Sequence, residues 1–432
     1  MPRCIHAVGI DSGGLDEQLS NKGANMQFSK TFRLLQVCVL LAGSGLSAAE
    51  PQSIRIGVIG PLSVKSSEDM GLSIIGGAKV FQSDINMSGG VMGQQIELVI
   101  RDDQAKPEIG VAMAKELVEK EKVVAVVGFA NTGVALPAAK VLQEAKVPVI
   151  VSGATGASVT KAFMPPAYPA SYVFRTSASD ALQPIVILND AIDRRKLDKF
   201  ALLHDESPYG QFGRQSVLAE LERRKIKPVA VEGFKVGESD MKAQMQRVKE
   251  SGANVIVVYC LGADAVTVVK TAEKEGLKLP LVGPWTLSQQ TFIDKAGSSA
   301  EGVRTSVTFI ENELSSVKNQ FAVNYRKING VSRIPSAVAA AQTYDALRLI
   351  SLAIFQAGST EGPKIQAALE NLTHSTTSTV VSRYARPFTP SDHEAITENM
   401  IVLGEIRKAQ VTYAYKEDAS SAGIMRTKAP AK

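Results

Sequence analysis

Short apolar runs alternate with helical patterns along most of the chain. The first four runs are rich in valine and isoleucine and cover residues 54–59, 96–100, 123–127 and 147–151. Their length and β-branched composition are typical of strands that are buried on both faces of a parallel sheet. Between the runs, apolar residues recur at helical spacing, as in the series Ile74, Ala78, Phe81 and Ile85. The alternation predicts right-handed crossover units and an α/β fold with a doubly wound parallel sheet.

A second series of the same kind follows after residue 176. We expect strands at 200–203, 228–231, 255–258 and 279–282, and helices near 180–193, 210–224, 240–251 and 264–275. Two successive α/β sets of similar size predict two lobes with a cleft between them. Two further helical patterns, at 314–328 and 336–357, bring no new run of parallel strands, so we expect them to pack on a lobe that is already built.

The N-terminal segment has the order of a secretory signal peptide. Lys30 and Arg33 precede a largely apolar run, residues 34–42, and small residues end at Ala49. The apolar run is too short to span a bilayer. We therefore interpret the first 49 residues as leader and signal peptide, with Met26 as an alternative start codon, and predict a periplasmic protein cleaved near Ala49.

The cysteines support a soluble product without disulfides. Cys4 and Cys38 precede the predicted cleavage point, and only Cys260 follows it, so the mature protein has no internal disulfide. Cys38 lacks the small preceding residue of a lipidation site, which favours a free protein over a lipid-anchored one. Cys260 ends an apolar run, which favours a buried, unreactive thiol over a nucleophile.

Length and charge exclude some classes of partner. The 432 residues are enough for two or three domains. The 48 basic and 43 acidic residues give a formal net charge of only +5, spread along the chain, which argues against nucleic-acid binding because that function needs a clustered basic face. Residues 417–432 contain few large apolar side chains, and we predict a disordered tail there.

Two junctions between a strand and a helix carry candidate ligand contacts. Ligands of open parallel sheets bind beyond the carboxyl ends of strands, where helix N-termini present unpaired N–H groups. Residues 126–133 place Asn131 and Thr132 at a helix start, and residues 149–156 place Thr155 at the next junction. Each side chain alone is explained by capping its own helix. Together, the two junctions favour a carboxylate site, with about 1.5–3 kcal/mol for each charge-assisted hydrogen bond.

A third junction, residues 203–210, contains His204, Asp205 and Ser207. Neighbouring residues of a strand point to opposite faces, so His204 and Asp205 cannot form a catalytic relay there. The chain has no motif of a hydrolase, zinc protease, phosphate loop or dinucleotide site, and its four histidines are scattered. We therefore expect a cleft that binds a small molecule without transforming it, with no catalytic residues, no metal and no cofactor.

Several short motifs occur in an order and spacing that resemble the leucine/isoleucine/valine-binding type of solute-binding protein, which serves ABC importers. The resemblance covers about residues 54–405, and its landmarks are residues 56–63, 84–86, 89–93, 102–103, 127–128, 174–176, 204–205, 209–210 and 283–284. It implies two α/β lobes joined by three crossing strands, which close on the ligand like a hinge. It also implies a membrane permease as the partner, and we expect a monomer.

The resemblance places the lobes and their connections along the chain. Crossings are expected near Thr176–Ser179, Thr308–Ile310 and Phe388. The first lobe would then contain residues 50–178 and 309–388, and the second lobe residues 179–308 and 389–416.

It also implies a ligand site between the lobes. In relatives that bind α-amino acids, the carboxylate is held at positions that match Thr132 and Ala154-Thr155 here. Asp180 falls where the family places an acid near the ligand's ammonium, and Tyr209 falls on a tyrosine that covers the ligand from the second lobe.

The departures from the family pattern concern the ligand. Trp285 stands where the amino-acid binders carry a glutamate for the ammonium, and Leu261 aligns with a ligand-facing tyrosine. Loss of one of two carboxylates costs a few kcal/mol in a closed cleft, whereas a tryptophan face returns about 0.5–2 kcal/mol by cation–π attraction. Trp285, Phe129 and Tyr209 would instead cover a flat apolar body.

We therefore expect a small aromatic or hydrophobic carboxylate as the ligand. The alternative is a branched-chain amino acid held by Asp180 alone. A sensor component that presents its ligand to a signalling partner, and an enzyme, are the competing functions of a different class.

Overall fold

A computed structural model of the protein describes residues 53–311, 315–374, 376 and 378–420. All of these residues belong to one compact unit, Pro51–Lys432. The predicted signal peptide, with Met26, Cys38 and Ala49, lies outside the described residues.

The first sheet has five parallel strands in the order β2-β1-β3-β4-β5. They are β1 (Ile54–Gly60), β2 (Ile96–Asp102), β3 (Ala125–Gly128), β4 (Val149–Val151) and β5 (Val173–Arg175). Every residue of β3, β4 and β5 is buried, because helices cover both faces of the sheet. The four predicted strands of this lobe are confirmed.

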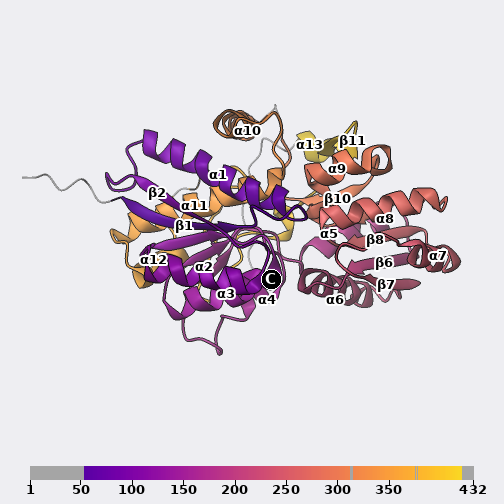
Figure 1. Ribbon diagram of the computed structural model, residues 1–432, viewed down its shortest axis with the longest axis horizontal. Helices are drawn as coiled ribbons and strands as arrows, with labels where there is room; N and C mark the ends of the chain where they lie inside the picture. Colours follow the sequence, from indigo (N-terminus) through magenta and orange to yellow (C-terminus); the bar gives the residue numbers. More distant parts are fainter. Residues whose placement is uncertain (1–52, 312–314, 375, 377, 421–432) are drawn as a thin grey trace, which may run out of the picture. The chain divides into compact units, whose positions relative to one another are not determined.

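Four helices accompany the first sheet: α1 (Glu68–Met87), α2 (Pro107–Glu119), α3 (Thr132–Glu144) and the short α4 (Ser158–Lys161). Figure 1 shows α1 on one side of the sheet and α2 and α3 on the other. The strand side chains alternate accordingly. Ile56 and Val58 pack in the core that contains α1, whereas Ile59 and Val126 pack with α2 and α3.

The second sheet has seven strands in the order β12-β11-β10-β9-β8-β6-β7. They are β6 (Phe200–Asp205), β7 (Ala230–Phe234), β8 (Val255–Tyr259), β9 (Leu281–Gly283), β10 (Arg304–Val307), β11 (Val402–Arg407) and β12 (Gln410–Tyr413). Strands β6 to β10 are parallel, and β11 and β12 are antiparallel to their neighbours. The expected strands at 228–231 and 279–282 begin later than predicted, because Pro228 and Pro280 have no N–H for a strand ladder.

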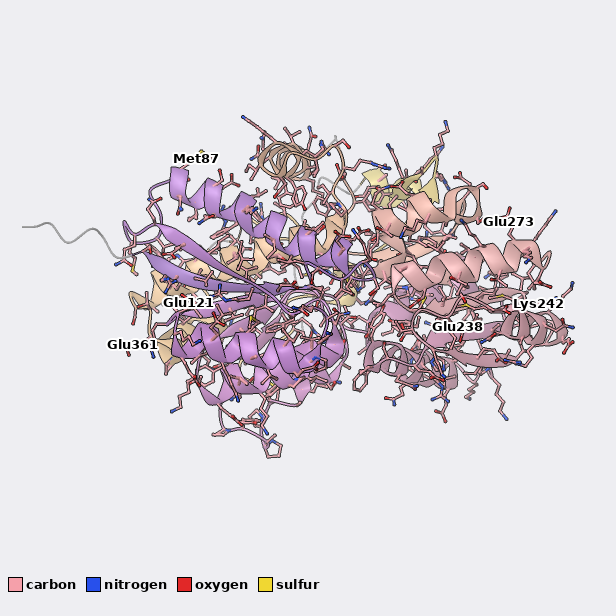
Figure 2. All side chains as sticks on the ribbon, in the orientation of Figure 1. Met87, Glu121, Glu238, Lys242, Glu273 and Glu361 are labelled. Carbon is pink, nitrogen blue, oxygen red and sulfur yellow. The ribbon has the colours of Figure 1, made fainter. Side chains whose placement is uncertain are left out.

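The four helices predicted for the second sheet are present in the predicted order, and one further helix, Gln290–Ala296, was not predicted. They are α5 (Gln183–Leu188) with the π-helical turn Asn189–Arg194, α6 (Pro208–Arg223), α7 (Lys242–Glu250) and α8 (Gly262–Lys274), followed by the turn Trp285–Ser288, α9 (Gln290–Ala296) and the turn Gly297–Ala300. Side chains fill the space between the ribbons in Figure 2, where the labelled Glu238, Lys242 and Glu273 lie on the part of the molecule that holds the second sheet.

Three later helices complete the first lobe: α10 (Ser316–Asn329), α11 (Ala337–Ala357) and α12 (Gly362–Glu370). In the part of the chain that the structure describes, α11 is the one helix long and apolar enough to cross a membrane, but 83% of its apolar stretch is buried, as in the core helix of a soluble domain. It packs against α1 so closely that a Cβ atom on Gly77 would lie 2.2 Å from the Ala340 carbonyl oxygen. The prediction that these later helices pack on a lobe that is already built is thus confirmed.

The chain passes between the two sheets three times: after β5, after β10 and before β11. The third crossing lies later than the predicted position at Phe388. Residues 393–395 still pair with β5, since the Arg175 N–H donates to the His393 carbonyl and the Ala395 N–H donates to the Arg175 carbonyl, each at 2.9 Å. The reason is that β5 is an edge strand whose backbone needs a partner.

The prediction of a disordered tail from residue 417 places its start too early. Lys416–Ser420 form a short helix, α13, which follows the turn Glu398–Met400 and strands β11 and β12. The ring of Tyr415, next to this helix, lies 3.9 Å from the Arg194 guanidinium, and this cation–π contact fixes the segment on the second lobe. Residues 421–432 lie outside the described part.

Candidate functional site

The first junction follows β3, where the backbone turns sharply into α3. Gly128 has φ +124°, and a Cβ atom there would lie 2.0 Å from the Ile59 carbonyl oxygen, so only glycine fits. Phe129 follows with φ +60°, and its N–H donates to the same carbonyl at 2.8 Å. The Phe129 ring is fully buried in the first lobe's core, in the apolar cluster with Val134 and Ala154. The ring thus packs among the apolar side chains of the junction, and its expected contact with a ligand stays a prediction.

The second junction is tied to the first by hydrogen bonds. The Ala154 N–H donates to the Phe129 carbonyl at 2.8 Å, and the Gly156 N–H donates to the Thr132 hydroxyl at 3.2 Å. Thr132 and Thr155 are buried. The Thr155 carbonyl accepts a hydrogen bond from the Asp180 N–H at 2.8 Å, so both junctions meet the first crossing.

Asn131 does not cap α3, because its side chain makes no capping hydrogen bond. Its Nδ2 donates to the Ser67 hydroxyl at 3.2 Å, and its buried Oδ1 has no partner among the described residues. The sequence left open that Asn131 caps α3, and the structure does not show that cap.

A buried arginine holds the second junction in place. Arg175, at the end of β5, donates from Nη1 to the Gly156 carbonyl at 2.7 Å. Its Nε and Nη2 donate to the two carboxylate oxygens of Glu394 at 2.8 and 2.6 Å. The bidentate pair is favourable in a buried place because both carboxylate oxygens are satisfied.

Asp180 lies at the first crossing and is fully buried. Its Oδ1 accepts hydrogen bonds from the Tyr259 hydroxyl at 3.0 Å and from Gln183 Nε2 at 3.2 Å. Its Oδ2 has no hydrogen-bond partner among the described residues. Burial raises the pKa of Asp180 to about 7, although the Thr155 side chain, the charge of Arg175 and the Tyr259 hydroxyl all lower it.

Gln183 connects Asp180 to Trp285. While its Nε2 bonds to Asp180, its Oε1 accepts from the Trp285 backbone N–H at 3.1 Å and from the Ser306 hydroxyl at 2.9 Å. The indole of Trp285 is only 3% exposed, and its Nε1 has no hydrogen-bond partner within the described residues. An N–H donor buried in this way needs an acceptor oxygen.

Tyr209 stands beside the same group from the second lobe. Its ring centre is 5.5 Å from that of Tyr259. Its hydroxyl is buried and makes no hydrogen bond of good geometry in the described part of the chain. Burial and the nearby Asp180 raise its pKa well above the usual value, although the Thr286 side chain lowers it. Leu261, which is 8% exposed at the start of α8, belongs to the apolar cluster that also contains Tyr209, Tyr259 and Trp285.

The structure thus links Asp180 to Tyr209 through Tyr259, to the Trp285 backbone through Gln183 and to the Thr155 backbone directly. Leu261 shares with them only the large apolar core cluster. Reading the sequence missed Tyr259 and Gln183. Period-two alternation along β8 was the available signal, because Val255, Val257 and Tyr259 share one face of the strand. Gln183 carries no such signal, since its two bonds join segments about a hundred residues apart in sequence.

The third junction has the side-chain contacts of a structural turn. The His204 ring bonds to the Asp205 backbone carbonyl at 3.0 Å, and the Asp205 carboxylate accepts from the Ser207 N–H at 3.0 Å. Cys260 is buried, as predicted, and burial raises the pKa of its thiol well above the usual value.

Comparison with known proteins identifies the fold and the family. The family model described as "Periplasmic binding protein" matches residues 53–410. The chain belongs to the periplasmic binding protein family. Leu/Ile/Val-binding protein homolog 3 of Brucella melitensis is 28% identical to this periplasmic binding protein over 356 residues, which are 80% of this chain and 93% of the relative. The Leu/Ile/Val-binding type that the sequence motifs indicated is therefore confirmed.

A second curated relative, an amino acid binding protein of Pseudomonas aeruginosa, is 33% identical over 233 residues, or 54% of this chain and 60% of the relative. Homologues of this periplasmic binding protein are solute-binding proteins. They have the two-lobed α/β arrangement of the type I fold, as predicted.

Solved structures with different ligands share this fold. The branched-chain amino acid transporter substrate binding protein LivJ of Streptococcus pneumoniae, in complex with isoleucine, has a TM-score of 0.71 at 24% identity and covers 83% of this chain and 98% of its own. A solute binding protein of an ABC transporter from Rhodopseudomonas palustris, in complex with 3,4-dihydroxybenzoic acid, has a TM-score of 0.68 at 22% identity, with coverage of 83% and 95%. At these identities the likeness shows the fold and not the ligand.

Proposed function

We propose that this protein captures a small aromatic or hydrophobic carboxylate between its lobes in the periplasm and delivers it unchanged to the membrane permease of an ABC importer. The observation that carries the proposal is a pair of buried donors, the Trp285 indole N–H and the Tyr209 hydroxyl, which make no hydrogen bond of good geometry among the described residues. Tyr209 lies near Asp180, and the Trp285 backbone is joined to Asp180 through Gln183.

Energetics support a ligand that brings its own oxygen atoms. Each buried donor without a partner costs about 1–3 kcal/mol, and an oxygen substituent of the ligand would remove that cost. A small acid with a flat apolar body also suits the ring surfaces of Tyr209, Tyr259 and Trp285. We assign its carboxylate to the Thr132 and Ala154-Thr155 junctions, where helix and turn N–H groups attract an anion.

A branched-chain amino acid is the second candidate, and the unpartnered Oδ2 of Asp180 favours it. That oxygen would accept a hydrogen bond from an α-ammonium group. Asp180 would be the one carboxylate for that charge, because Trp285 occupies the position of the family's glutamate, so we rank this candidate second. The solved relatives with isoleucine and with 3,4-dihydroxybenzoic acid give both ligand classes a precedent in this fold.

Calorimetric titration with benzoate, 4-hydroxybenzoate and leucine tests the proposal. We expect micromolar binding, about −8 kcal/mol, for at least one aromatic acid and weaker binding of leucine. Because Trp285 is the single tryptophan, its fluorescence reports independently whether the ligand reaches the indole. Micromolar leucine binding together with no response to any aromatic acid would refute the preferred ligand class.

The variant Trp285→Glu sharpens the same test. It restores the second carboxylate of the amino-acid binders, so aromatic-acid binding is expected to weaken and leucine binding to strengthen, each by about tenfold, or about 1.4 kcal/mol. The matched control is Tyr168→Glu, a change on a ring that packs against Phe163 in the first lobe. No change in either ligand for Trp285→Glu would place the indole outside the ligand site.

The transport role has its own tests. Mass spectrometry of whatever co-purifies with the protein identifies the ligand directly, and its recovery intact after incubation separates a receptor from an enzyme. Size-exclusion chromatography tests the expected monomer. Genes for a permease and an ATPase next to this gene would support import, and a gene for a signalling receptor in their place would support the sensor function.

A further inference from the structure

Asp69 connects the two lobes from outside the proposed ligand site. It lies in the first turn of α1, in the first lobe. Its carboxylate accepts two hydrogen bonds from Thr291 of α9, in the second lobe, one from the backbone N–H at 2.7 Å and one from the hydroxyl at 2.8 Å. One side chain of the first lobe thus accepts two hydrogen bonds from a single residue of the second lobe.

The side chain that precedes α9 does not supply an acceptor for Thr291. The first N–H groups of any helix lack intrahelical partners. Gln289, which precedes α9, makes no capping hydrogen bond with its side chain. Asp69 supplies the acceptor from the first lobe, and bonds to a carboxylate are about twice as strong as neutral ones. Partial burial raises the pKa of Asp69, and so does the charge of Glu68, whereas the Thr291 donors and Lys295 lower it.

The contact sits on the segment that carries Trp285. The turn Trp285–Ser288 leads directly into α9, so a bond at Thr291 fixes the chain six residues beyond the indole. A second bond between the lobes lies next to it, from the Gln290 N–H to the Pro335 carbonyl at 2.8 Å. Asp69 therefore helps to position Trp285 from outside the proposed ligand site.

Asp84 provides an internal comparison because it belongs to the same helix. Its Oδ2 accepts a hydrogen bond from the Tyr344 hydroxyl at 2.9 Å, and both residues belong to the first lobe. A hinge motion that separates the lobes leaves the Asp84 bond intact and breaks the bonds of Asp69 to Thr291.

We propose that Asp69 is a positioning residue that sets the affinity for the ligand by stabilising the closed arrangement of the lobes. The inference rests on the proposed function in one respect, that the lobes open and close around a ligand. A bond made only in the closed state shifts the population toward that state, so it strengthens the binding of any ligand captured there.

The first test needs no ligand. A Cβ atom on Gly133 would lie 3.2 Å from Cγ of Pro208, across the junction between the lobes, so the pair Gly133→Cys and Pro208→Cys can form a disulfide only when the lobes are closed. Its rate of formation reports the closed population even when that population is small. Adding Asp69→Asn is expected to slow the reaction about tenfold, and adding Asp84→Asn to leave it unchanged. Equal rates with and without Asp69→Asn would overturn the inference.

A double-mutant cycle then isolates the pair. Thr291→Val removes the hydroxyl, and in the variant with both changes the disulfide is expected to form no more slowly than with Asp69→Asn alone, because the two residues act through one contact. Fully additive effects would overturn the inference. Thermal unfolding of each variant separates a shift in closure from a loss of stability.

The last test uses ligands and separates this inference from the proposed function. For whichever of 4-hydroxybenzoate and leucine binds the unmodified protein, Asp69→Asn is expected to raise the dissociation rate about tenfold, with Asp84→Asn unchanged. An unchanged dissociation rate would overturn the role of Asp69. If neither compound binds the unmodified protein, the proposed ligands are wrong, and the disulfide rates still decide the role of Asp69.

Discussion

Two aspartates, Asp180 and Asp345, are equally buried and differ in how they are satisfied. Both are fully inaccessible to solvent, and burial raises the pKa of each to about 7. Asp345, in α11, accepts from the Val380 N–H at 2.7 Å, the Val381 N–H at 3.0 Å and the Tyr384 hydroxyl at 2.8 Å, so both of its oxygens are used. Asp180 has one oxygen with donors and one without a partner in the described chain.

The difference separates a structural group from a candidate binding group. Backbone N–H groups in the same lobe satisfy Asp345, and such donors do not move when the lobes do. Side chains alone, Tyr259 and Gln183, supply the Asp180 donors. Burial and a raised pKa therefore do not distinguish Asp180 from Asp345. The two residues differ in whether all of their carboxylate oxygens accept hydrogen bonds, which is informative because native proteins rarely leave a buried polar atom without a partner.

The largest expected effect is on stability at Asp345. Asp345→Ala leaves two N–H groups and one hydroxyl without an acceptor, at about 1–3 kcal/mol each, so the free energy of unfolding should fall by about 3 kcal/mol or more. Asp180→Ala should cost less, about 2 kcal/mol, because two donors, those of Tyr259 and Gln183, lose their acceptor. Urea denaturation measures both. An equal loss of stability in the two variants would contradict the difference in hydrogen bonding between Asp345 and Asp180.

Asp180→Asn tests the binding role with little change in shape. The amide oxygen can still accept from Tyr259, but the negative charge is gone. Leucine binding should weaken about 100-fold, or about 2.7 kcal/mol, whereas an aromatic carboxylate should bind as well as before or better. Asp345→Asn is the matched control, and calorimetry should show no selective change there. A similar loss for both ligands in Asp180→Asn would mean that its charge does not discriminate between them.

The pH dependence of binding should have opposite signs for the two ligand classes. Asp180 titrates near pH 7 in the free protein, and a bound anion raises its pKa further, so binding takes up a proton. Aromatic-acid affinity should then rise as the pH falls from 8 to 7, by up to about tenfold per unit. A bound ammonium lowers the pKa, so leucine affinity should fall as the pH drops below 7. Calorimetric titration with each ligand at a series of pH values from 5.5 to 8.5 measures this pH dependence of the affinity.

The control for the pH experiment is Asp180→Asn, in which the dependence should vanish for both ligands. Asp345 has the same raised pKa but lies in the first lobe's core, and its replacement by asparagine should leave the pH profile of binding unaltered. A profile that stays steep in Asp180→Asn would assign the proton to another group.

The smallest expected effects come from the two tyrosines that donate to these carboxyls. Tyr384→Phe should lower the free energy of unfolding by about 1 kcal/mol without a change in affinity. Tyr259→Phe should cost a similar amount and also weaken leucine binding about fivefold, because Asp180 loses a donor that stabilises its charge. Denaturation and calorimetry on the two variants check this. Equal affinities would indicate that the Tyr259 hydroxyl is structural.

Much of the fold could be predicted from the sequence, because strands buried on both faces and their crossover helices leave local patterns. The runs at 54–59 and 255–258 became β1 and β8 almost unchanged. The third crossing could not be placed in the same way. Its position depends on the pairing of residues 393–395 with β5 and on the Arg175–Glu394 ion pair, which are contacts between distant segments.

Candidate site residues could be named from the sequence in part. Motifs at fixed spacing carry Asp180, Tyr209 and Trp285; the structure places Tyr209 near Asp180 and joins the Trp285 backbone to Asp180 through Gln183, and their contact with a ligand stays a prediction. Phe129 was also assigned to the ligand, and that assignment stays a prediction; the sequence does not reveal its left-handed backbone or the packing of its ring in the first lobe's core. Asp69 gave no signal at all, because its partner lies 222 residues away.

The sequence by itself determined the two α/β lobes, the family and the alternation of strands and helices, because hydrophobic periodicity and short motifs are local properties of the chain. Tertiary structure alone decided which polar groups are satisfied. Asp180 and Asp345 are the same residue type at similar burial, and they differ in hydrogen bonding because their donors lie far away in sequence and close in space.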